Sequence, residues 1–481
     1  MTSAEAETTP TRDQPIPPLY AVTGALLVGA LSFFLIEADV MPENWVYGGV
    51  LAVILLLIAT EYMHKTIVVM IGSGLCLFLA AAGGHLSGGH GGLPPYVEMV
   101  EWNTVAIIVG ASIFVELASR SGIFTYISIK LLKLSRGRPL RLLIFYSVLT
   151  LLFSAFLDNI TAMIIVGSLT IIASEKLSMN PLPFVLTEAI MTNLGGTLTL
   201  ISSVPNIIIG TKAGISYMTF VYTMSPYVAV ATVGSIAVSW YLFPETFQQE
   251  LSPEQRAEKE ERVKEFNEWD TVDDPTFFNV SVICVICFIA AFALHGVVPV
   301  IKSLPLEWVA LGFATLMLII YPAEVEDTLE KVEWSLIFFF IGLFTVIGVM
   351  QQVGVLGQIG LFLKDYLSAG AYRGPGYLMW ASTVLSSVTA NIPLAAMMSE
   401  IIGGMELAMD KDGLWWGLVL GSNLGGNITP IGSASTMVGV TALRREGISL
   451  SFMGFVRKGL CFASLQLVLA TAYLAILVSL L

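Results

Sequence analysis

Residues 192–203 read TNLGGTLTLISS, and residues 422–433 read SNLGGNITPIGS, so the chain carries Asn-Leu-Gly-Gly twice, 230 residues apart. Each copy interrupts an apolar run with a glycine pair and continues directly into threonine and serine. In hydrocarbon every backbone polar group needs an internal partner, and glycine pairs weaken helices. The two motifs therefore predict two broken helices whose unwound backbone lines a polar cavity.

The repeat extends outward from these motifs in nearly the same register. A shift of 232 residues relates four further features of the two halves, in order: Glu101-Trp102 to Glu333-Trp334, Gly110 to Gly342, Gly122 to Gly354, and Asp158-Asn159 to Ala390-Asn391. Matches in one order at one spacing indicate an internal duplication.

The composition places this duplication in a membrane. Of 481 residues, 56% are hydrophobic and only 12% are charged, against roughly 25% charged in soluble domains. About 20 apolar residues span a bilayer. Apolar segments of about this kind recur along the whole chain, at 19–37, 46–61, 66–83, 104–119, 142–157, 159–174, 183–210, 218–243, 276–295, 306–321, 335–350, 377–390, 392–408, 414–440 and 454–480.

Charge sets the expected topology. The basic segment KLLKLSRGRPLR, residues 130–141, predicts a cytoplasmic loop. Counting back four crossings places the N-terminus in the cytoplasm, and the expected location is the cell (inner) membrane. With a cytoplasmic linker between the halves, the two copies run in opposite senses, which is typical of secondary transporters. The expected fold is thus an all-α polytopic membrane protein of two inverted repeats with broken helices and re-entrant hairpins.

The expected domain boundaries follow from the same pattern. They are a disordered cytoplasmic tail (1–18), an extra N-terminal transmembrane helix (19–45), a first repeat with scaffold and transport parts (46–243), a charged cytoplasmic linker (244–275) and a second such repeat (276–481).

The polar residues at and around the two breaks are the predicted substrate site. Small polar residues can also serve only to pack helices closely, but two matched copies favour binding. The candidates are Asn159, Asn193, Gly195, Gly196, Thr197, Thr199, Ser202, Thr389, Asn391, Asn423, Gly425, Gly426, Asn427, Thr429 and Ser433.

Three carboxyl groups within apolar runs are candidates for proton coupling. Asp158 is the first, because a carboxylate inside a membrane is costly and marks function by default, although it could also simply cap a helix beginning at Asn159. Glu116 and Glu188 also lie in apolar surroundings, and either could be a structural polar contact instead.

The stretch from LSRGRPLRLLIF through FLDNITAMI to TEAIMTNLGGTLTLISSVPNIIIG resembles the ion-transporter superfamily of arsenite permeases, NhaD-type sodium–proton antiporters and the melanosomal P protein. The segment LWWGLVLGSNLGGNITPIGSASTMVGV is similar to the same superfamily. The resemblance covers about residues 100–465. It implies a scaffold domain and a transport domain, often in a homodimer, with substrate between two hairpins and two broken helices.

One departure from the superfamily bears on the substrate. The sodium–proton antiporters carry an Asp-Asn pair in both repeats, whereas the second copy here reads Ala390-Asn391. A site with one carboxylate fewer suits a neutral or anionic substrate better than sodium. The expected function is proton-coupled efflux of arsenite or antimonite. Sodium–proton exchange and transport of a dicarboxylate or other oxyanion remain alternatives.

Other partners and functions are constrained more weakly. The net charge of −13 argues against nucleic-acid binding. No Walker motif, channel filter, catalytic triad or metal-ligand cluster is visible in the sequence, so no enzyme activity, metal or cofactor is expected. The expected partners are membrane lipid, a small ion or oxyacid, protons and a second copy of the chain, and a separate ATPase subunit is not excluded.

Overall fold

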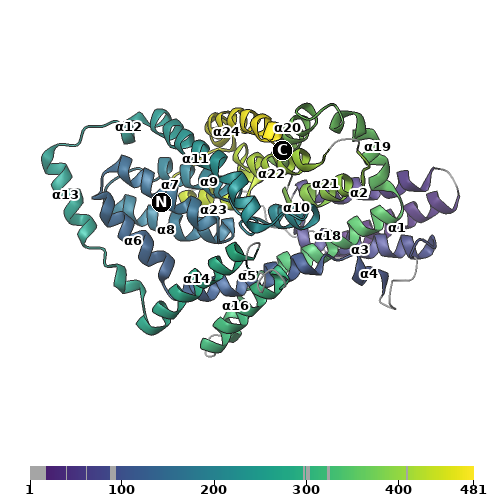
Figure 1. Ribbon diagram of the computed structural model, residues 1–481, viewed down its shortest axis with the longest axis horizontal. Helices are drawn as coiled ribbons and strands as arrows, with labels where there is room; N and C mark the ends of the chain where they lie inside the picture. The colour runs from purple at the N-terminus through teal and green to yellow at the C-terminus, as the bar shows by residue number, and fades with distance from the viewer. Residues whose placement is uncertain are drawn as a thin grey trace, which may run out of the picture. The chain divides into compact units, whose positions relative to one another are not determined.

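A computed structural model describes residues 18–38, 41–60, 62–86, 94–295, 298, 304–321, 325–389, 391–407 and 410–480 (Figure 1). Residues 1–17 of the predicted tail (1–18) and Ala390 lie outside these residues. The described elements are all helices, and eight of them are long and apolar enough to cross a membrane. The predicted all-α membrane fold is therefore confirmed. The chain divides into two compact units, which are described separately.

The first unit comprises residues 1–100 and 338–355. Its helices are α1 (Pro18–Glu37), α2 (Glu43–Thr60), α3 (Lys65–Ala82), α4 (Pro95–Glu98) and most of α18 (Trp334–Gln352). The ammonium of Lys65 lies 5.6 Å from the centre of the Phe339 ring, a cation–π contact that joins α3 to α18.

The second unit comprises residues 101–337 and 356–481 and contains both sequence motifs. From the first repeat it holds α5 (Trp102–Arg120), α6 (Ile123–Ser135), α7 (Pro139–Ser154), α8 (Asn159–Lys176), α9 (Leu182–Gly195), α10 (Val204–Ala213) and α11 (Tyr217–Leu242). From the second it holds α19 (Val355–Leu367), α20 (Arg373–Val388), α21 (Asn391–Gly404), α22 (Asp412–Leu424), α23 (Ala434–Arg445) and α24 (Phe452–Leu480). The linker between the repeats holds α12 (Pro244–Phe247) and α13 (Pro253–Lys264), and the second repeat begins with α14 (Pro275–Leu294), α16 (Leu306–Ile320) and α17 (Val325–Glu330).

The helices repeat in the register that the sequence predicts. Helices α5 and α18 each have 19 residues and begin 232 residues apart, and α6 and α19 each have 13 residues at the same shift. Packing repeats as well, because α7 lies against α9 as α20 lies against α22, and α8 lies against α23 as α21 lies against α10. The cross-packing of α8 with α23 and of α21 with α10 interlocks the two repeats.

Both predicted helix breaks are confirmed. Helix α9 ends at Gly195, and the chain is non-helical until α10 begins at Val204. In the second copy α22 ends at Leu424, two short 3₁₀ turns follow, and α23 begins at Ala434. Each break thus separates a helix that ends in the motif from a shorter helix that starts after it.

The glycine that begins each Gly-Gly pair also allows two helices to approach closely. A Cβ on Gly195 would lie 2.5 Å from the Leu151 carbonyl oxygen of α7, and a Cβ on Gly425 would lie 2.5 Å from the Thr383 oxygen of α20. The motif therefore serves close helix packing as well as helix termination.

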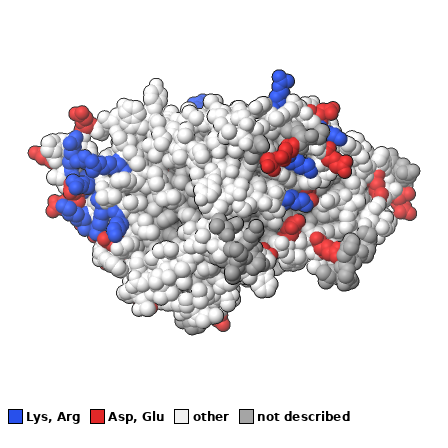
Figure 2. Space-filling model, in the orientation of Figure 1, with Lys and Arg blue, Asp and Glu red and all other residues white. Residues whose placement is uncertain are grey.

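The basic segment 130–141 is not a simple loop. Lys130 and Lys133 lie in the last turns of α6, and a left-handed turn at Arg136 and Gly137 leads into α7. Figure 2 shows basic side chains gathered at the left edge of the view, over the ends of α6 and α8 and the linker helix α13. The prediction of a loop failed because Leu131, Leu132 and Leu134 extend the apolar pattern of α6.

The charged linker folds and packs against the first repeat. The ammonium of Lys259 in α13 donates to the Leu177 carbonyl oxygen over 2.5 Å, and Arg262 donates to the Lys176 oxygen over 2.8 Å. These carbonyls are the unpaired acceptors at the C-terminal end of α8, where cations are favourable. The linker thereby caps a helix of the first repeat from outside it.

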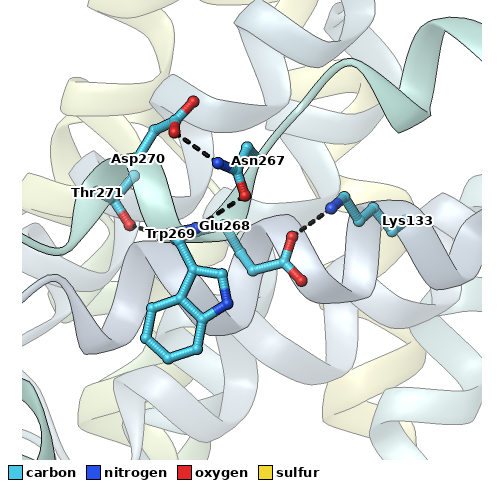
Figure 3. Close-up of polar contacts among 6 residues, drawn as sticks. All are labelled: Lys133, Asn267, Glu268, Trp269, Asp270 and Thr271. Atoms are coloured by element: carbon cyan, nitrogen blue, oxygen red, sulfur yellow. Dashed lines mark hydrogen bonds and ion pairs between the residues drawn. The ribbon is translucent and has the colours of Figure 1, made fainter. Parts of the chain in front are cut away.

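A second linker contact follows α13 (Figure 3). The 3₁₀ turn Glu268–Thr271 places Glu268 in an ion pair with Lys133 of α6, and the Trp269 ring packs edge-on against Tyr126 at 5.0 Å. The Lys133 ammonium lowers the pKa of the Glu268 carboxyl below its ordinary value. Asn267 donates to Asp270 over 2.6 Å and stabilises the turn.

Candidate functional site

The two helix breaks meet in a crossed pair of hydrogen bonds. The Ser433 hydroxyl, after the second break, donates to Oδ1 of Asn193 over 2.7 Å. The Ser203 hydroxyl, after the first break, donates to Oδ1 of Asn423 over 3.0 Å. Ser203 and Ser433 stand 230 residues apart, like Asn193 and Asn423. Each repeat therefore gives the other the same bond, as expected when a two-fold axis relates them.

The amide nitrogens of the same two asparagines cross as well. Asn423 Nδ2 donates to Asn206 Oδ1 over 2.8 Å, and Asn193 Nδ2 lies 3.5 Å from the Thr436 hydroxyl, which holds the corresponding place. Asn193 Nδ2 also donates to Asn427 Oδ1 over 2.8 Å. Asn193 and Asn423 are each 3% exposed, so the network is buried.

A second layer of matched bonds holds the breaks in place. The Ser154 hydroxyl donates to the Thr192 carbonyl over 2.6 Å, and the Ser386 hydroxyl donates to the Ser422 carbonyl over 2.7 Å. Thr199 donates to the Ala155 carbonyl over 2.6 Å, as its counterpart Thr429 does to the Ser387 carbonyl over 2.6 Å. These bonds tie the unwound backbone to α7 and α20, respectively.

Most of the predicted substrate residues belong to this assembly. Asn159 accepts from Ser154, and its amide is within 3.2 Å of where a Cβ on Gly196 would lie. Ser202 donates to the Gly196 carbonyl over 2.8 Å, whereas Thr197 only bonds back to its own helix. Gly426 lies against the amide of Asn193.

Two predicted residues of the second repeat, Thr389 and Asn391, make no bond to the network among the residues that the structure describes. The Thr389 hydroxyl donates to the Leu385 carbonyl of its own helix. Asn391 is the first residue of α21 and is half-buried.

The three candidate carboxyl groups lie in different environments. Asp158 is exposed and caps α8, because its Oδ1 accepts from the Thr161 backbone N–H over 2.9 Å. Glu116 pairs with Arg120 at 3.0 Å and with Lys331 at 3.3 Å. Glu188 is 1% exposed; its Oε1 accepts from Thr170 over 2.6 Å, and its Oε2 has no partner among the described residues.

Four residues of the network escaped the sequence prediction: Ser154, Ser386, Gln466 and Ser235. Ser154 and Ser386 could have been found, because they match each other in the repeat register. Four others, Ser203, Asn206, Ser435 and Thr436, lie at the breaks in the sequence and bond within the network, although they were not among the predicted substrate residues.

The network can recognise a small polar solute without charge. Its members are amides, hydroxyls and backbone groups, which offer both donors and acceptors. No group of three or more metal-ligating side chains occurs among the described residues. In this form the groups satisfy one another, as Ser433 and Asn193 do, so a ligand at this place would have to replace some of these bonds.

Comparison with known proteins agrees with a transporter. The 46 kDa membrane protein of Mycobacterium leprae is 29% identical over 87% of this chain and 95% of its own length. An uncharacterized transporter of Mycobacterium tuberculosis is 29% identical over 78% of this chain and 86% of its own. The human P protein is 26% identical over 92% of this chain, which spans 60% of that protein.

Two solved transporters share the fold. MtrF of Neisseria gonorrhoeae, described as illuminating a class of antimetabolite efflux pumps, aligns with a TM-score of 0.54 at 13% identity, over 88% of this chain and 96% of its own. The YdaH transporter of Alcanivorax borkumensis aligns with a TM-score of 0.56 at 14% identity, over 87% and 99%.

The family match is more specific than these likenesses. The model of the citrate transporter family, CitMHS, matches residues 55–421, which include the first helix break and the second repeat up to the residue before Ser422. The predicted resemblance to the ion-transporter superfamily is thus confirmed at the level of this family and the P protein, but not for arsenite permeases or NhaD antiporters. The chain is a membrane transporter and belongs to the citrate transporter family.

Proposed function

We propose that this protein is a proton-coupled secondary transporter of a small oxygen-rich acid, which binds between the two helix breaks. The observation that carries the proposal is the crossed pair of bonds, Ser433 to Asn193 and Ser203 to Asn423. A site shared equally by two inverted repeats can be reached from either side as the repeats exchange conformations. The N-terminal ends of α10 and α23 adjoin the same breaks, and the helix dipole there favours a cargo with partial negative charge.

Arsenite is the first candidate cargo. Near neutral pH it is mainly an uncharged trihydroxide, with three O–H donors and three oxygen acceptors. Uncharged amides and hydroxyls can satisfy such a solute without a counter-charge. The absence of a second carboxylate at Ala390 supports a cargo that is not a cation.

A citrate-type carboxylate is the second candidate, and the family match favours it. Carboxylate oxygens would accept from the hydroxyls of Ser203 and Ser433 and from backbone N–H groups at the helix N-termini. Sodium is the third candidate; it would have to rely on neutral oxygens and the single carboxylate of Asp158.

Glu188 is the proposed proton carrier, with Asp158 as the alternative. Burying a carboxylate charge with one unpaired oxygen is costly, and a bound proton removes that charge. Glu188 lies on α9, which also carries Asn193, so its protonation and the occupancy of the break can influence each other. The exposed Asp158 already has a structural role as the cap of α8.

Flux into proteoliposomes with an imposed pH gradient tests the proposal. Arsenite, antimonite, citrate, succinate and sodium are compared, with the double variant Asn193→Ala/Asn423→Ala as the control for the site. We expect uphill movement of one oxyacid that the gradient drives and the double variant loses. Gradient-driven movement of sodium alone, or oxyacid flux that persists in the double variant, would contradict it.

A further inference from the structure

A chain of buried side chains leads away from Asn193 to the far side of the site. Asn193 Nδ2 donates to Asn427 Oδ1 over 2.8 Å, Asn427 Nδ2 donates to Gln466 Oε1 over 2.7 Å, and Gln466 Nε2 donates to Ser235 Oγ over 3.0 Å. Asn427, Gln466 and Ser235 are each fully buried. The chain connects α9 through the second break to α24 and α11, the long helices that close the two repeats.

Asn423, the counterpart of Asn193 in the other repeat, is held in a different way. Asn206 Nδ2 donates to two backbone carbonyls, those of Gly196 at 2.7 Å and Thr199 at 2.9 Å. Carbonyls only accept, so the Asn206 amide has one possible orientation. Its Oδ1 then receives the Nδ2 of Asn423, which also donates to the Val419 carbonyl over 2.9 Å. The Asn423 oxygen is therefore fixed toward Ser203.

Among the described residues, the series of side chains that starts at Asn193 has no bond to a backbone carbonyl that would fix its direction. At one end Asn193 meets hydroxyls, those of Ser433 at 2.7 Å and of Ser435 and Thr436 at 3.5 Å. At the other end it finishes at the Ser235 hydroxyl. A hydroxyl donates or accepts by rotating its proton, and the oxygen and nitrogen of an amide occupy nearly the same space. Rotating the side-chain amides of Asn193, Asn427 and Gln466 by half a turn keeps every hydrogen bond of the series and exchanges donor and acceptor in each.

Among the described residues of the first repeat, no equivalent series of hydrogen-bonded amides occurs. The position that corresponds to Asn427 is Thr197, whose hydroxyl donates to the Leu194 carbonyl of its own helix over 2.6 Å. The reversible chain is thus an addition to one half of an otherwise matched site.

We propose that Asn427, Gln466 and Ser235 form a reversible hydrogen-bond relay that sets whether Asn193 offers its oxygen or its nitrogen to the cargo. This inference rests on the proposed function and specifies how one site takes acids in different protonation states. In the direction observed, Asn193 offers an acceptor to a donor such as a cargo O–H. In the reverse direction it offers an N–H to a deprotonated oxygen. Gln466 and Ser235 act through Asn427 and are positioning residues.

The first test does not need a cargo. Members of one hydrogen-bond network couple energetically, whereas separate sites add. We measure how far Tm falls in Ser235→Ala, in Asn193→Ala and in the double variant of the full chain. The control is the same comparison with Ser239→Ala in place of Ser235→Ala. Ser239 lies one turn along α11 and bonds Thr187 instead. If the relay exists, Tm should fall less in Ser235→Ala/Asn193→Ala than the sum of the two single losses. In Ser239→Ala/Asn193→Ala the fall in Tm should equal that sum. Additive losses for Ser235 overturn it.

The second test asks which atom Asn193 offers, by comparing the affinities for two probes. Arsenite can donate hydrogen bonds, whereas succinate only accepts them at neutral pH. A carboxyl only accepts once it is ionised, so Gln466→Glu locks the relay in the observed direction at a pH high enough to ionise this buried group. We expect arsenite affinity to persist and succinate affinity to fall about tenfold, the value of one hydrogen bond. Gln466→Leu, which breaks the relay, should weaken both.

The outcomes separate the two proposals. An unchanged arsenite-to-succinate ratio in Gln466→Glu, when the parent binds both, overturns the relay and leaves the proposed function standing. If the parent binds neither probe, the proposed cargo class is wrong, and the melting comparison alone decides the relay. If Gln466→Glu fails to fold, Asn427→Asp applies the same lock from the neighbouring amide.

Discussion

Ser433 donates its hydroxyl proton to Asn193 Oδ1 over 2.7 Å, and these two residues come from opposite repeats, 240 positions apart. With its mirror bond from Ser203 to Asn423, this contact holds the two halves of the chain together through small side chains. Hydrogen bonds weaken steeply with distance and angle, so a small shift of either repeat would weaken both contacts.

Replacing Asn423 should weaken cargo binding and leave the protein folded. Asn423→Ala removes the acceptor of Ser203 and the donor to Asn206, and loss of one hydrogen bond costs about 0.5–1.5 kcal/mol. We expect Kd to rise up to about tenfold, measured by isothermal titration calorimetry. Asn180→Ala, at the exposed turn before α9, is the matched control and should bind as the parent does. Equal affinity in both variants would remove Asn423 from the site.

Glu188→Gln should separate binding from coupling. The amide keeps the bond from Thr170 and carries no titratable proton. We expect cargo exchange down its own gradient to continue, while uphill flux driven by a pH gradient disappears. The Tm should not fall, because no buried charge is created. Gradient-driven flux at the parental rate would show that the proton travels elsewhere.

Asp158→Asn should have little effect, because asparagine caps a helix as well as aspartate does. Asp158→Ala removes the acceptor of the Thr161 N–H and should lower stability by about 0.5–2 kcal/mol. Chemical or thermal unfolding of both variants, with the pH-driven flux assay, checks the expectation. Lost coupling in Asp158→Asn, with normal stability, would make Asp158 the proton carrier in place of Glu188.

Adding a methyl group to the first glycine of either motif should separate two packed helices. In Gly195→Ala and Gly425→Ala the new Cβ would meet a backbone oxygen at 2.5 Å, which cannot move as a side chain can. Overpacking of this kind costs about 1–3 kcal/mol. Gly376→Ala, in α20 where the added Cβ meets nothing within 4 Å, is the control and should stabilise slightly. Melting curves of the three variants decide the point.

The pair of Lys133 and Glu268 should make the linker's attachment depend on pH and salt. The pKa of Glu268 is lowered in the folded protein, so the pair contributes stability above the ordinary glutamate pKa and loses it as the pH falls through the folded value. The pair is partly exposed, so its coupling should be about 0.2–1 kcal/mol. A double-mutant cycle with Lys133→Ala and Glu268→Ala should find that coupling at neutral pH and low salt. Coupling that persists at pH 3 or in high salt would contradict an ionic origin.

Local chemistry allowed the breaks to be predicted, and the internal repeat allowed their pairing to be predicted. Asn-Leu-Gly-Gly inside an apolar run has few stable solutions in hydrocarbon, and the second copy, in a half with the opposite expected topology, implied that the two breaks correspond. The same register contained Ser203 and Ser433, each of which donates to the asparagine of the opposite repeat.

The relay could not be predicted in this way. Gln466 and Ser235 lie on long apolar helices, and their meeting depends on how α24 and α11 are rotated about their axes. That rotation is set by the packing of many apolar side chains that look alike in sequence. A lone glutamine in the apolar run of α24 was the signal available, and by itself it names no partner.

The capping of α8 by the linker has a consequence for how the two halves could be divided. Lys259 and Arg262 belong to the segment that precedes the second repeat, yet they bond the end of a helix in the first. A chain cut between Gln248 and Leu251 would leave α13 attached to the C-terminal fragment and its docking place on the N-terminal one. The contacts between α13 and the end of α8 would then join the two fragments. The protein could therefore be assembled from two separate polypeptides without a peptide bond between them.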